Sequence, residues 1–187
     1  MSVRPFLWSI CCLFLIAPHA LRATVLLPAE FREIVNGADI IAYGRVVETA
    51  VEQSDDRKQV DTLVTFQVGT YLKGGPGDSI VFKVPGGTIG RYRNVLVGAP
   101  QFAAGDEAVL FLNSRGREVP SIFGLNQGVF RVALDQARRR MVTPPLLARG
   151  SVPETVVRGA AGRRPLPLET FGAEVRAVLS DAARSVR

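Results

Sequence analysis

Alternating apolar and polar positions along this chain predict a protein built mainly of β-strands. The alternation is cleanest over residues 60–73, where one face is apolar and the other polar, as in a half-buried strand. The apolar face of this stretch holds Val60, Val64, Phe66, Val68 and Leu72. The other expected strands cover residues 41–51, 80–84, 108–112, 122–132 and 139–142. Six short strands with tight turns predict a small closed barrel or a sandwich.

Two of the expected strands have distinctive features. Residues 108–112 are apolar on both faces, which is typical of a strand that is covered on both sides. The strand over residues 41–51 contains Gly44, and a glycine inside a strand often marks a bend or the close approach of another backbone. We therefore expect this strand to bend at Gly44.

A short helix is expected before the strands, over residues 28–36. Pro28 suits a first helical position, Glu30 suits the positive end of the helix dipole, and Gly37 suits the stop.

A second helix is expected at residues 168–187, where apolar side chains fall on one helical stripe. We expect it to pack back on the strands; the alternative is a helix that forms only on a partner. Residues 143–167 are rich in proline, glycine and arginine and predict a linker. The expected organisation is therefore a β-barrel domain over residues 24–142, this linker and the C-terminal helix.

The first 23 residues have the composition of a signal peptide. A basic start is followed by an apolar run over residues 6–17 and then by small residues, with cleavage expected after Ala23 or Ala20. The run is shorter than the roughly 20 apolar residues that span a membrane, so an uncleaved anchor is the less favoured alternative. Cleavage after Ala23 leaves Thr24 as the first residue. We expect a protein exported to the periplasm or secreted, with no membrane span after cleavage.

Loss of that segment would also remove both cysteines, the only histidine and the only tryptophan. Ser-His-Asp and Cys-His sites would then be impossible, as would a zinc site with nitrogen or sulfur ligands. Three weaker alternatives stay open: a Ser79–Lys83 pair, a carboxylate pair for glycoside hydrolysis, and a calcium site near Asp55, Asp56 and Asp61. The candidate carboxylates are Asp55, Asp56, Asp106 and Glu107. Because acids in turns usually cap and solubilise, we expect no enzyme activity, no cofactor and no metal.

A long Gly- and Pro-rich stretch over residues 85–106 is the first candidate for a binding site. Loops longer than about 12–15 residues are uncommon and often functional. This one contains Arg91, Tyr92 and Arg93, and both residue types are favoured at protein interfaces. The alternative is an ordinary loop with solvated arginines. The second candidate is the polar turn that holds Asp55, Asp56, Arg57 and Lys58.

Positive charge is concentrated at the C-terminal end of the chain. Residues 24–137 carry slightly more acidic than basic side chains, whereas residues 138–187 carry ten arginines and four acids. We attribute the excess of arginine over lysine to a GC-rich coding bias, and we expect no nucleic-acid partner. The alternative function that this charge favours is an envelope-associated structural protein whose basic C-terminal segment contacts anionic surface polymer.

Three stretches of the chain resemble known proteins. They are residues 38–47 after the short helix, Leu72-Lys73-Gly74 at the end of the second strand, and residues 105–112 after the long loop. Together they resemble a family of exported bacterial proteins of unknown function. Their order is similar to the netrin-like domain of tissue inhibitors of metalloproteinases. This resemblance covers residues 28–132 and implies an OB-like antiparallel β-barrel.

The resemblance also implies a partner, a secreted protease. Those inhibitors place a cysteine at the mature N-terminus, where its amine and carbonyl bind the protease's zinc. Here Thr24 takes that place, and no disulfide can brace it. Because an unbraced terminus loses ordering entropy on docking, we expect binding through a barrel face or loop. The expected function is an exported, non-enzymatic protein-binding module that binds or modulates a secreted protease.

Overall fold

The structure, a computed structural model of the chain, describes residues 28–53, 59–75, 77–145 and 163–185. These residues form mainly β structure with two helices, α2 (Phe31–Gly37) and α3 (Leu168–Ser185). The strands are β1 (Ile40–Gln53), β2 (Val60–Lys73), β3 (Ser79–Pro85), β4 (Gly87–Ile89), β5 (Tyr92–Asn94), β6 (Glu107–Asn113), β7 (Ser121–Ile122), β8 (Val129–Leu134), β9 (Arg140–Thr143) and β10 (Leu166–Pro167).

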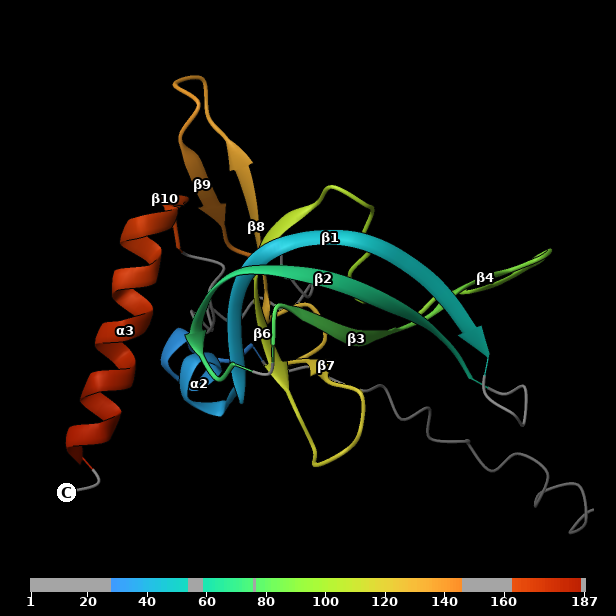
Figure 1. The fold of residues 1–187 in the computed structure, drawn as a ribbon, viewed down its shortest axis with the longest axis horizontal. Coiled ribbons are helices and arrows are strands. Elements are labelled where there is room, and N and C mark those ends of the chain that lie inside the picture. Colours follow the sequence, from blue (N-terminus) through green and yellow to red (C-terminus); the bar gives the residue numbers. More distant parts are fainter. Residues whose placement is uncertain (1–27, 54–58, 76, 146–162, 186–187) are drawn as a thin grey trace, which may run out of the picture.

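Eight of these strands form one mixed sheet in the order β1-β2-β3-β7-β6-β8-β9-β10, and β1 also pairs with β6. The expected small closed antiparallel barrel is therefore wrong. The sheet branches at β6, because β8 pairs with residues 107–110 of β6 and leaves only residues 112–113 for β7. β7 in turn meets β3 in parallel, through Lys83 and Ser121 alone. β8, β9 and β10 extend away from this junction as an open continuation (Figure 1).

β1 and β2 form a long curved ribbon that arches over the molecule (Figure 1). Their register shifts between Ile41 and Ala42, between Tyr43 and Gly44, and again between Val46 and Glu48, and such bulges bend a strand. A Cβ on Gly44 would lie 2.1 Å from the backbone oxygen of Gln67, so the ribbon leaves no room for a side chain there. The pairing is irregular at Gly44, but the extra residue there is Gly69 of β2 and the bulged residue of β1 is Val47, so the bend expected at Gly44 itself stays a prediction. We call residues 46–53 of β1 and 60–66 of β2 the arm.

A bulge in β2 decides which face its end presents. Tyr43 pairs with Thr70 and Gly44 pairs with Val68, so Gly69 is an extra residue. One extra residue moves the side chains that follow to the opposite face. Leu72 therefore packs against the cluster under the helices, whereas Val68 packs against the cluster on the other side of the sheet. The expectation that Leu72 shares the face of Val68 is wrong.

β6 separates two apolar clusters. Val109 and Phe111 belong to the cluster under the helices, whereas Ala108, Leu110 and Leu112 belong to the cluster inside the curve of β1, β2 and β3. All five side chains are fully buried. The prediction of a strand covered on both faces is therefore confirmed.

Four phenylalanine rings form the centre of the cluster under the helices. Phe31 of α2, Phe111 of β6, Phe130 of β8 and Phe171 of α3 all contact one another, with ring centroids between 5.0 and 6.4 Å apart. Aromatic pairs at such distances add to the free energy of burial. We call this group the phenylalanine cluster.

α2 begins three residues later than Pro28. Glu30 is its N-cap and forms a capping box with Glu33, in which the Glu30 backbone N–H donates to Glu33 Oε2 at 2.8 Å. Pro28 therefore precedes the helix instead of filling its first position. Gly37 is the last helical residue, one position before the C-cap.

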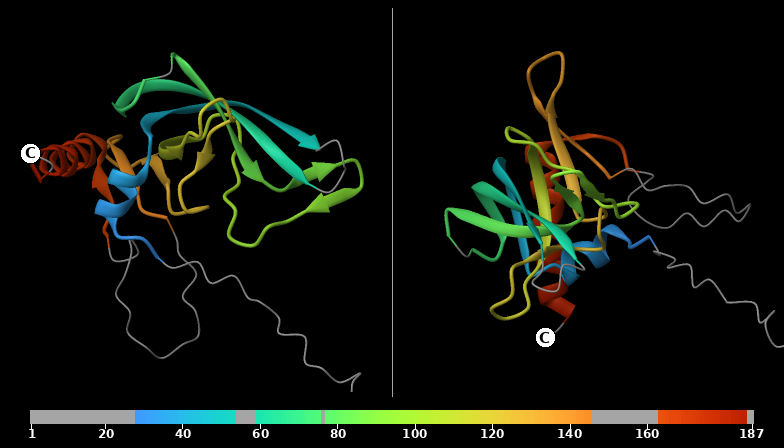
Figure 2. Two further views of the ribbon diagram at one scale, coloured as in Figure 1. Left: turned by 90° about the horizontal axis from the view of Figure 1, so that it is seen from below. Right: turned by 90° about the vertical axis from the view of Figure 1, so that its right-hand side faces the viewer.

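α3 packs against α2, β2, β9 and β10 (Figure 2), and it buries Phe171 and Val175. The prediction that this helix packs back on the strands is confirmed. The expected linker over 143–167 differs at both ends, because Thr143 closes β9 and Leu166–Pro167 pairs with β9 as β10. Residues 146–162 lie outside the described residues.

The single strand expected over residues 122–132 is two strands. Between β7 and β8 the chain turns, and Gly124 and Leu125 have φ values of 56° and 63°. Such left-handed backbone cannot continue a strand. As a result, β7 pairs with β3 and β6, whereas β8 pairs with β6 and β9.

Candidate functional site

The long stretch over residues 85–106 is built around the β4–β5 hairpin, at the end of the molecule opposite α3 (Figures 1 and 2). Gly90 and Arg91 join its two strands. Gly90 has a φ of 57°, as expected for the first central residue of a type II′ hairpin turn. The turn therefore places Arg91 at the tip, with Tyr92 and Arg93 directly after it.

Apolar side chains are strongly exposed in and after this hairpin. Tyr92 is 75% exposed and Val97 is 91% exposed, with Val95 and Leu96 also largely in solvent. Arg91 and Arg93 are exposed beside Tyr92. We call these six residues, Arg91, Tyr92, Arg93, Val95, Leu96 and Val97, the hairpin patch. Exposed apolar side chains that are grouped in this way often mark interaction sites on soluble proteins.

The base of the hairpin is fixed against the arm. Gly86 N donates to the Val60 carbonyl at 2.8 Å, and Thr62 Oγ1 donates to the Gly86 carbonyl at 2.7 Å. A Cβ on Gly87 would lie only 2.7 Å from Val51 Cγ1. The hairpin therefore approaches the arm too closely for any residue but glycine at this point.

A cleft of about 410 Å³ opens between the arm, the hairpin and residues 95–102. Thr49 and Val51 line it from the arm, and Leu96 and Phe102 line it from the loop. Arg93 is the one charged residue along its wall in the part of the chain that the structure describes. This lining suits the binding of apolar and neutral polar groups. It lacks the facing acids or bases that proton transfer needs.

A second polar group surrounds Glu107, at the start of β6. Its carboxylate accepts hydrogen bonds from Tyr43 Oη at 2.6 Å, from Arg45 Nη2 at 3.0 Å and from Arg140 Nε at 3.1 Å. The hydrogen bond from Tyr43 is the main cause that lowers the pKa of Glu107 below its ordinary value. Burial and the bond to Glu107 raise the pKa of Tyr43. Glu107 is thus held ionised, whereas a catalytic acid needs a raised pKa.

The neighbouring carboxylate of Asp106 is also occupied. Arg131 Nη1 donates to Asp106 Oδ2 at 2.7 Å, and the Ala103 backbone N–H donates to the same oxygen at 3.0 Å. The Arg131 guanidinium also lies 4.6 Å from the centre of the Phe102 ring, which lines the cleft. Asp106 and Glu107 therefore act as anchors for arginines, and this arrangement does not favour the carboxylate pair considered from the sequence.

Ser79 and Lys83 share the exposed face of β3, as expected. They are four residues apart on a strand that rises about 3.3 Å per residue, so their backbones are separated by roughly 13 Å. That separation is too large for a hydrogen-bonded dyad.

Two groups of predicted site residues lie outside the described residues. They are the turn with Asp55, Asp56, Arg57 and Lys58, and the expected cleavage site at Ala23 and Thr24. In the described ranges no cluster of His, Cys, Asp and Glu could hold a metal ion. No helix there combines the length and hydropathy needed to cross a membrane.

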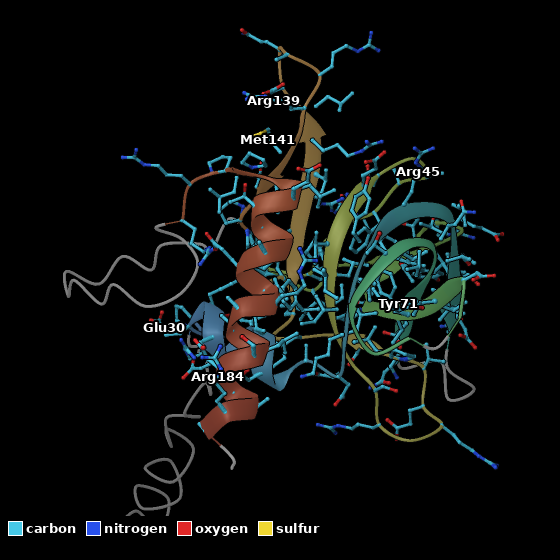
Figure 3. All side chains as sticks on the ribbon, turned by 60° about the vertical axis from the view of Figure 1, so that its left-hand side comes forward. Glu30, Arg45, Tyr71, Arg139, Met141 and Arg184 are labelled. Atoms are coloured by element: carbon cyan, nitrogen blue, oxygen red, sulfur yellow. The ribbon has the colours of Figure 1, made fainter. Side chains whose placement is uncertain are left out.

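Some arginines of the basic C-terminal segment form ion pairs. Arg139 Nη2 lies 2.8 Å from Asp135 Oδ2, Arg184 Nη2 lies 3.8 Å from Asp181 Oδ1, and Arg163 pairs with Glu174. Figure 3 shows Arg139 near the tip of the β8–β9 hairpin and Arg184 near the end of α3. The described arginines of this segment are therefore spread over distant positions, and part of their charge is neutralised locally.

Sequence reasoning found three members of the hairpin patch and missed the other three. Val95, Leu96 and Val97 lie between Asn94 and Gly98. A run of aliphatic residues with no alternation, inside a Gly- and Pro-rich loop, was the available signal. Such a run is read by default as buried, and only the structure places it in solvent.

Comparison of this chain with protein-family models, with curated proteins and with solved structures finds no match.

Proposed function

We propose that this chain is a non-enzymatic protein-binding module that docks on another exported protein through the hairpin patch. The observation that carries the proposal is the exposure of Tyr92 on β5 and of Val95, Leu96 and Val97 in the loop that follows it. Fully burying a valine or leucine side chain that starts in water yields about 1.5–3 kcal/mol. Four neighbouring apolar side chains therefore offer a substantial gain on docking.

The composition of the patch supports a protein partner over a small molecule. Tyrosine and arginine are enriched among the residues that dominate binding energy at protein interfaces. Arg91 and Arg93 flank Tyr92 and form no ion pair with another described residue. Their charge remains free to meet a carboxylate on the partner. A secreted protease is the partner class that the sequence resemblance implies.

We propose further that the strands around β6 form a partly open, OB-like arrangement. The support is the order of pairings, β1-β2-β3-β7-β6 with β6 returning to β1, together with the parallel contact of β3 and β7. OB-folds are five-stranded, partly open barrels whose loops and faces bind ligands. In this arrangement the β4–β5 hairpin lies in the connection between β3 and β6.

Site-specific photo-crosslinking tests the docking surface. A photoreactive amino acid would replace Val95 in one variant and Leu134 in another, since both side chains are 58% exposed and Leu134 lies on β8. Each variant would be expressed as the full chain, with its expected signal peptide. It would then be crosslinked in the exported fraction at about 50 and 500 mM salt. We expect one protein adduct from position 95 at both salt concentrations, because a packed apolar interface is little affected by screening.

The adduct must also depend on the patch itself. Adding Tyr92→Ala and Val97→Ser should abolish the crosslink from position 95. A crosslink that forms equally from positions 95 and 134, or one that disappears at high salt, would contradict docking through the hairpin patch.

A further inference from the structure

β1 has an unpaired edge where it leaves the body of the molecule. Up to Val46, the chain ahead of β6 runs beside β1: Val46 N donates to the Asp106 carbonyl and Gly105 N donates to the Val46 carbonyl, both at 2.8 Å. Past this point no described strand pairs with residues 47–52 on that side. The other side of the same residues is paired with β2. An edge of this length is a template for another strand.

The cleft opens beside this edge. Residues 95–102 diverge from β1, and Thr49 and Val51 line the cleft from the strand while Phe102 lines it from the loop. A strand added along residues 47–52 would point every second side chain towards these groups, because side chains alternate between the faces of a sheet. Alternate positions of an added strand would therefore meet an apolar wall.

The opposite face of the same edge is acidic. Glu48 and Glu52 alternate with Thr49 and Val51 and are exposed. Glu52 pairs directly with Asp61 of β2, and like charges facing each other across two strands are destabilising. A cation placed beside them would relieve this repulsion.

We infer that residues 47–52 of β1 bind an extended peptide segment by strand addition, and that the segment alternates apolar and basic side chains. Its backbone hydrogen-bonds with the free edge, its apolar side chains enter the cleft, and its basic side chains face Glu48 and Glu52. This inference rests on the proposed function, since it names the kind of segment that the partner presents beside the hairpin patch. Backbone bonds would give affinity and alternate side chains specificity, as in other cases of strand addition.

The same charges argue against a second copy of this chain as the occupant. Pairing two β1 edges across a two-fold axis would bring Glu48 and Glu52 of one copy beside those of the other. Such a contact adds acid to acid, whereas a basic segment neutralises it.

A synthetic probe tests the inference directly. It is a fluorescently labelled heptapeptide of alternating lysine and valine with blocked ends, titrated against the full chain by fluorescence anisotropy. We expect a Kd on the order of 100 µM, typical of a single short segment. Two control peptides separate the contributions: one replaces each valine by serine, and the other carries N-methyl groups that block backbone hydrogen bonds. Both should bind at least about tenfold more weakly.

Matched protein variants locate the site. Val51→Asp places a charge in the cleft, and Val81→Asp is its control, because Val81 has nearly the same exposure, 43% against 41%, but lies on β3 away from the cleft. The probe should lose at least about tenfold in affinity with Val51→Asp and little with Val81→Asp. The double change Glu48→Lys and Glu52→Lys should also weaken the probe, and circular dichroism checks that each variant is folded.

Hydrogen exchange provides a readout that does not depend on high affinity. At saturating probe, exchange should slow at amides of residues 47–52. Equal weakening by Val51→Asp and Val81→Asp, or unchanged exchange at residues 47–52, would overturn the inference. A dimer that is detected by light scattering and dissociates in the Val51→Asp variant would also overturn the inference, because the β1 edge would then serve self-association. If position 95 gives no crosslink but the probe binds as expected, docking through the hairpin patch is contradicted and strand addition at β1 is not.

Discussion

The helix end and the hairpin end of this molecule differ in whether their large apolar side chains are buried. At the helix end, Phe31 and Phe171 lie with two other rings between helices and sheet and are almost fully buried. At the hairpin end, Tyr92 on β5 and Val97 in the loop after it are exposed to solvent, and no described helix covers them. β1 runs from one end to the other, buried in its first half and exposed in its second.

The difference shows that hydropathy alone does not define a core. A side chain becomes part of the core only when other elements cover both it and its neighbours. The helix end has α2 and α3 to do this, whereas among the described residues the hairpin end has no helix and is flanked by residues 95–102. The docking that we propose for the hairpin patch would cover this apolar surface.

The largest expected effect comes from truncating one ring of the phenylalanine cluster. Phe130→Ala should lower the free energy of unfolding by about 3–5 kcal/mol, because it removes a buried ring and leaves a cavity. Tyr92→Ala is the matched truncation at the hairpin end and should cost no more than about 0.5 kcal/mol. Urea denaturation measures both. If the two changes lowered the free energy of unfolding by similar amounts, the claimed difference between a packed helix end and an uncovered hairpin end would be wrong.

The junction between the ends should be the next most sensitive point. Gly44→Ala should cost about 1–3 kcal/mol, since the new methyl group would collide with the Gln67 carbonyl and push the two strands apart. Gly75→Ala serves as the control, because a Cβ there meets nothing within 4 Å. A harmless Gly44→Ala would mean that β1 can bend without this close approach.

A smaller effect is expected at the polar cluster of β6. Glu107→Gln should cost about 1 kcal/mol at pH 7, the scale of one partly exposed ionic hydrogen-bond group. The folded-state pKa of Glu107 lies below its ordinary value of 4.5. Its stabilising contribution is therefore present above pH 4.5 and is lost as the pH falls through the folded-state pKa.

Unfolding curves of the two proteins at several pH values measure this contribution. The gap between wild type and Glu107→Gln should close in acid. A gap that stays constant down to pH 2 would show that the ionised carboxylate is not its source.

The smallest expected change in stability is in the loop part of the hairpin patch, after β5. Val97→Ser should alter the free energy of unfolding by less than about 0.5 kcal/mol and should still reduce crosslinking from position 95. Leu134→Ser, on another exposed apolar residue, should change neither quantity appreciably. If Val97→Ser leaves the crosslink intact, the side chain contributes nothing to docking.

Local patterns were sufficient to predict most of the individual elements. The period of two in β2 as far as Val68, the doubly apolar β6 and the stripe on α3 each depend on neighbours a few residues apart, and each is present. Arg91, Tyr92 and Arg93 were expected in a loop; the structure places Arg91 in the turn of a hairpin and the other two on the short strand β5, all of them exposed.

The arrangement of those elements could not be predicted, because it depends on distant residues. The Gly69 bulge turns Leu72 to the helices, and no alternation in the sequence reveals a bulge. The branch at β6 depends on where β8 stops pairing, and β10 is too short to form a pattern of its own. Exposure of Val95 likewise follows from what fails to cover it, which only the assembled chain decides.

The phenylalanine cluster also has a consequence for the order of folding. Its members stand at positions 31, 111, 130 and 171, so the contact between α2 and α3 joins residues that are very far apart in the sequence. Closing so long a loop is slow compared with forming local hairpins. The helix end therefore cannot be completed until residue 171 has been synthesised, and until then Phe31 lacks the part of its cover that Phe171 provides, which leaves apolar surface open to chaperones and to misassociation.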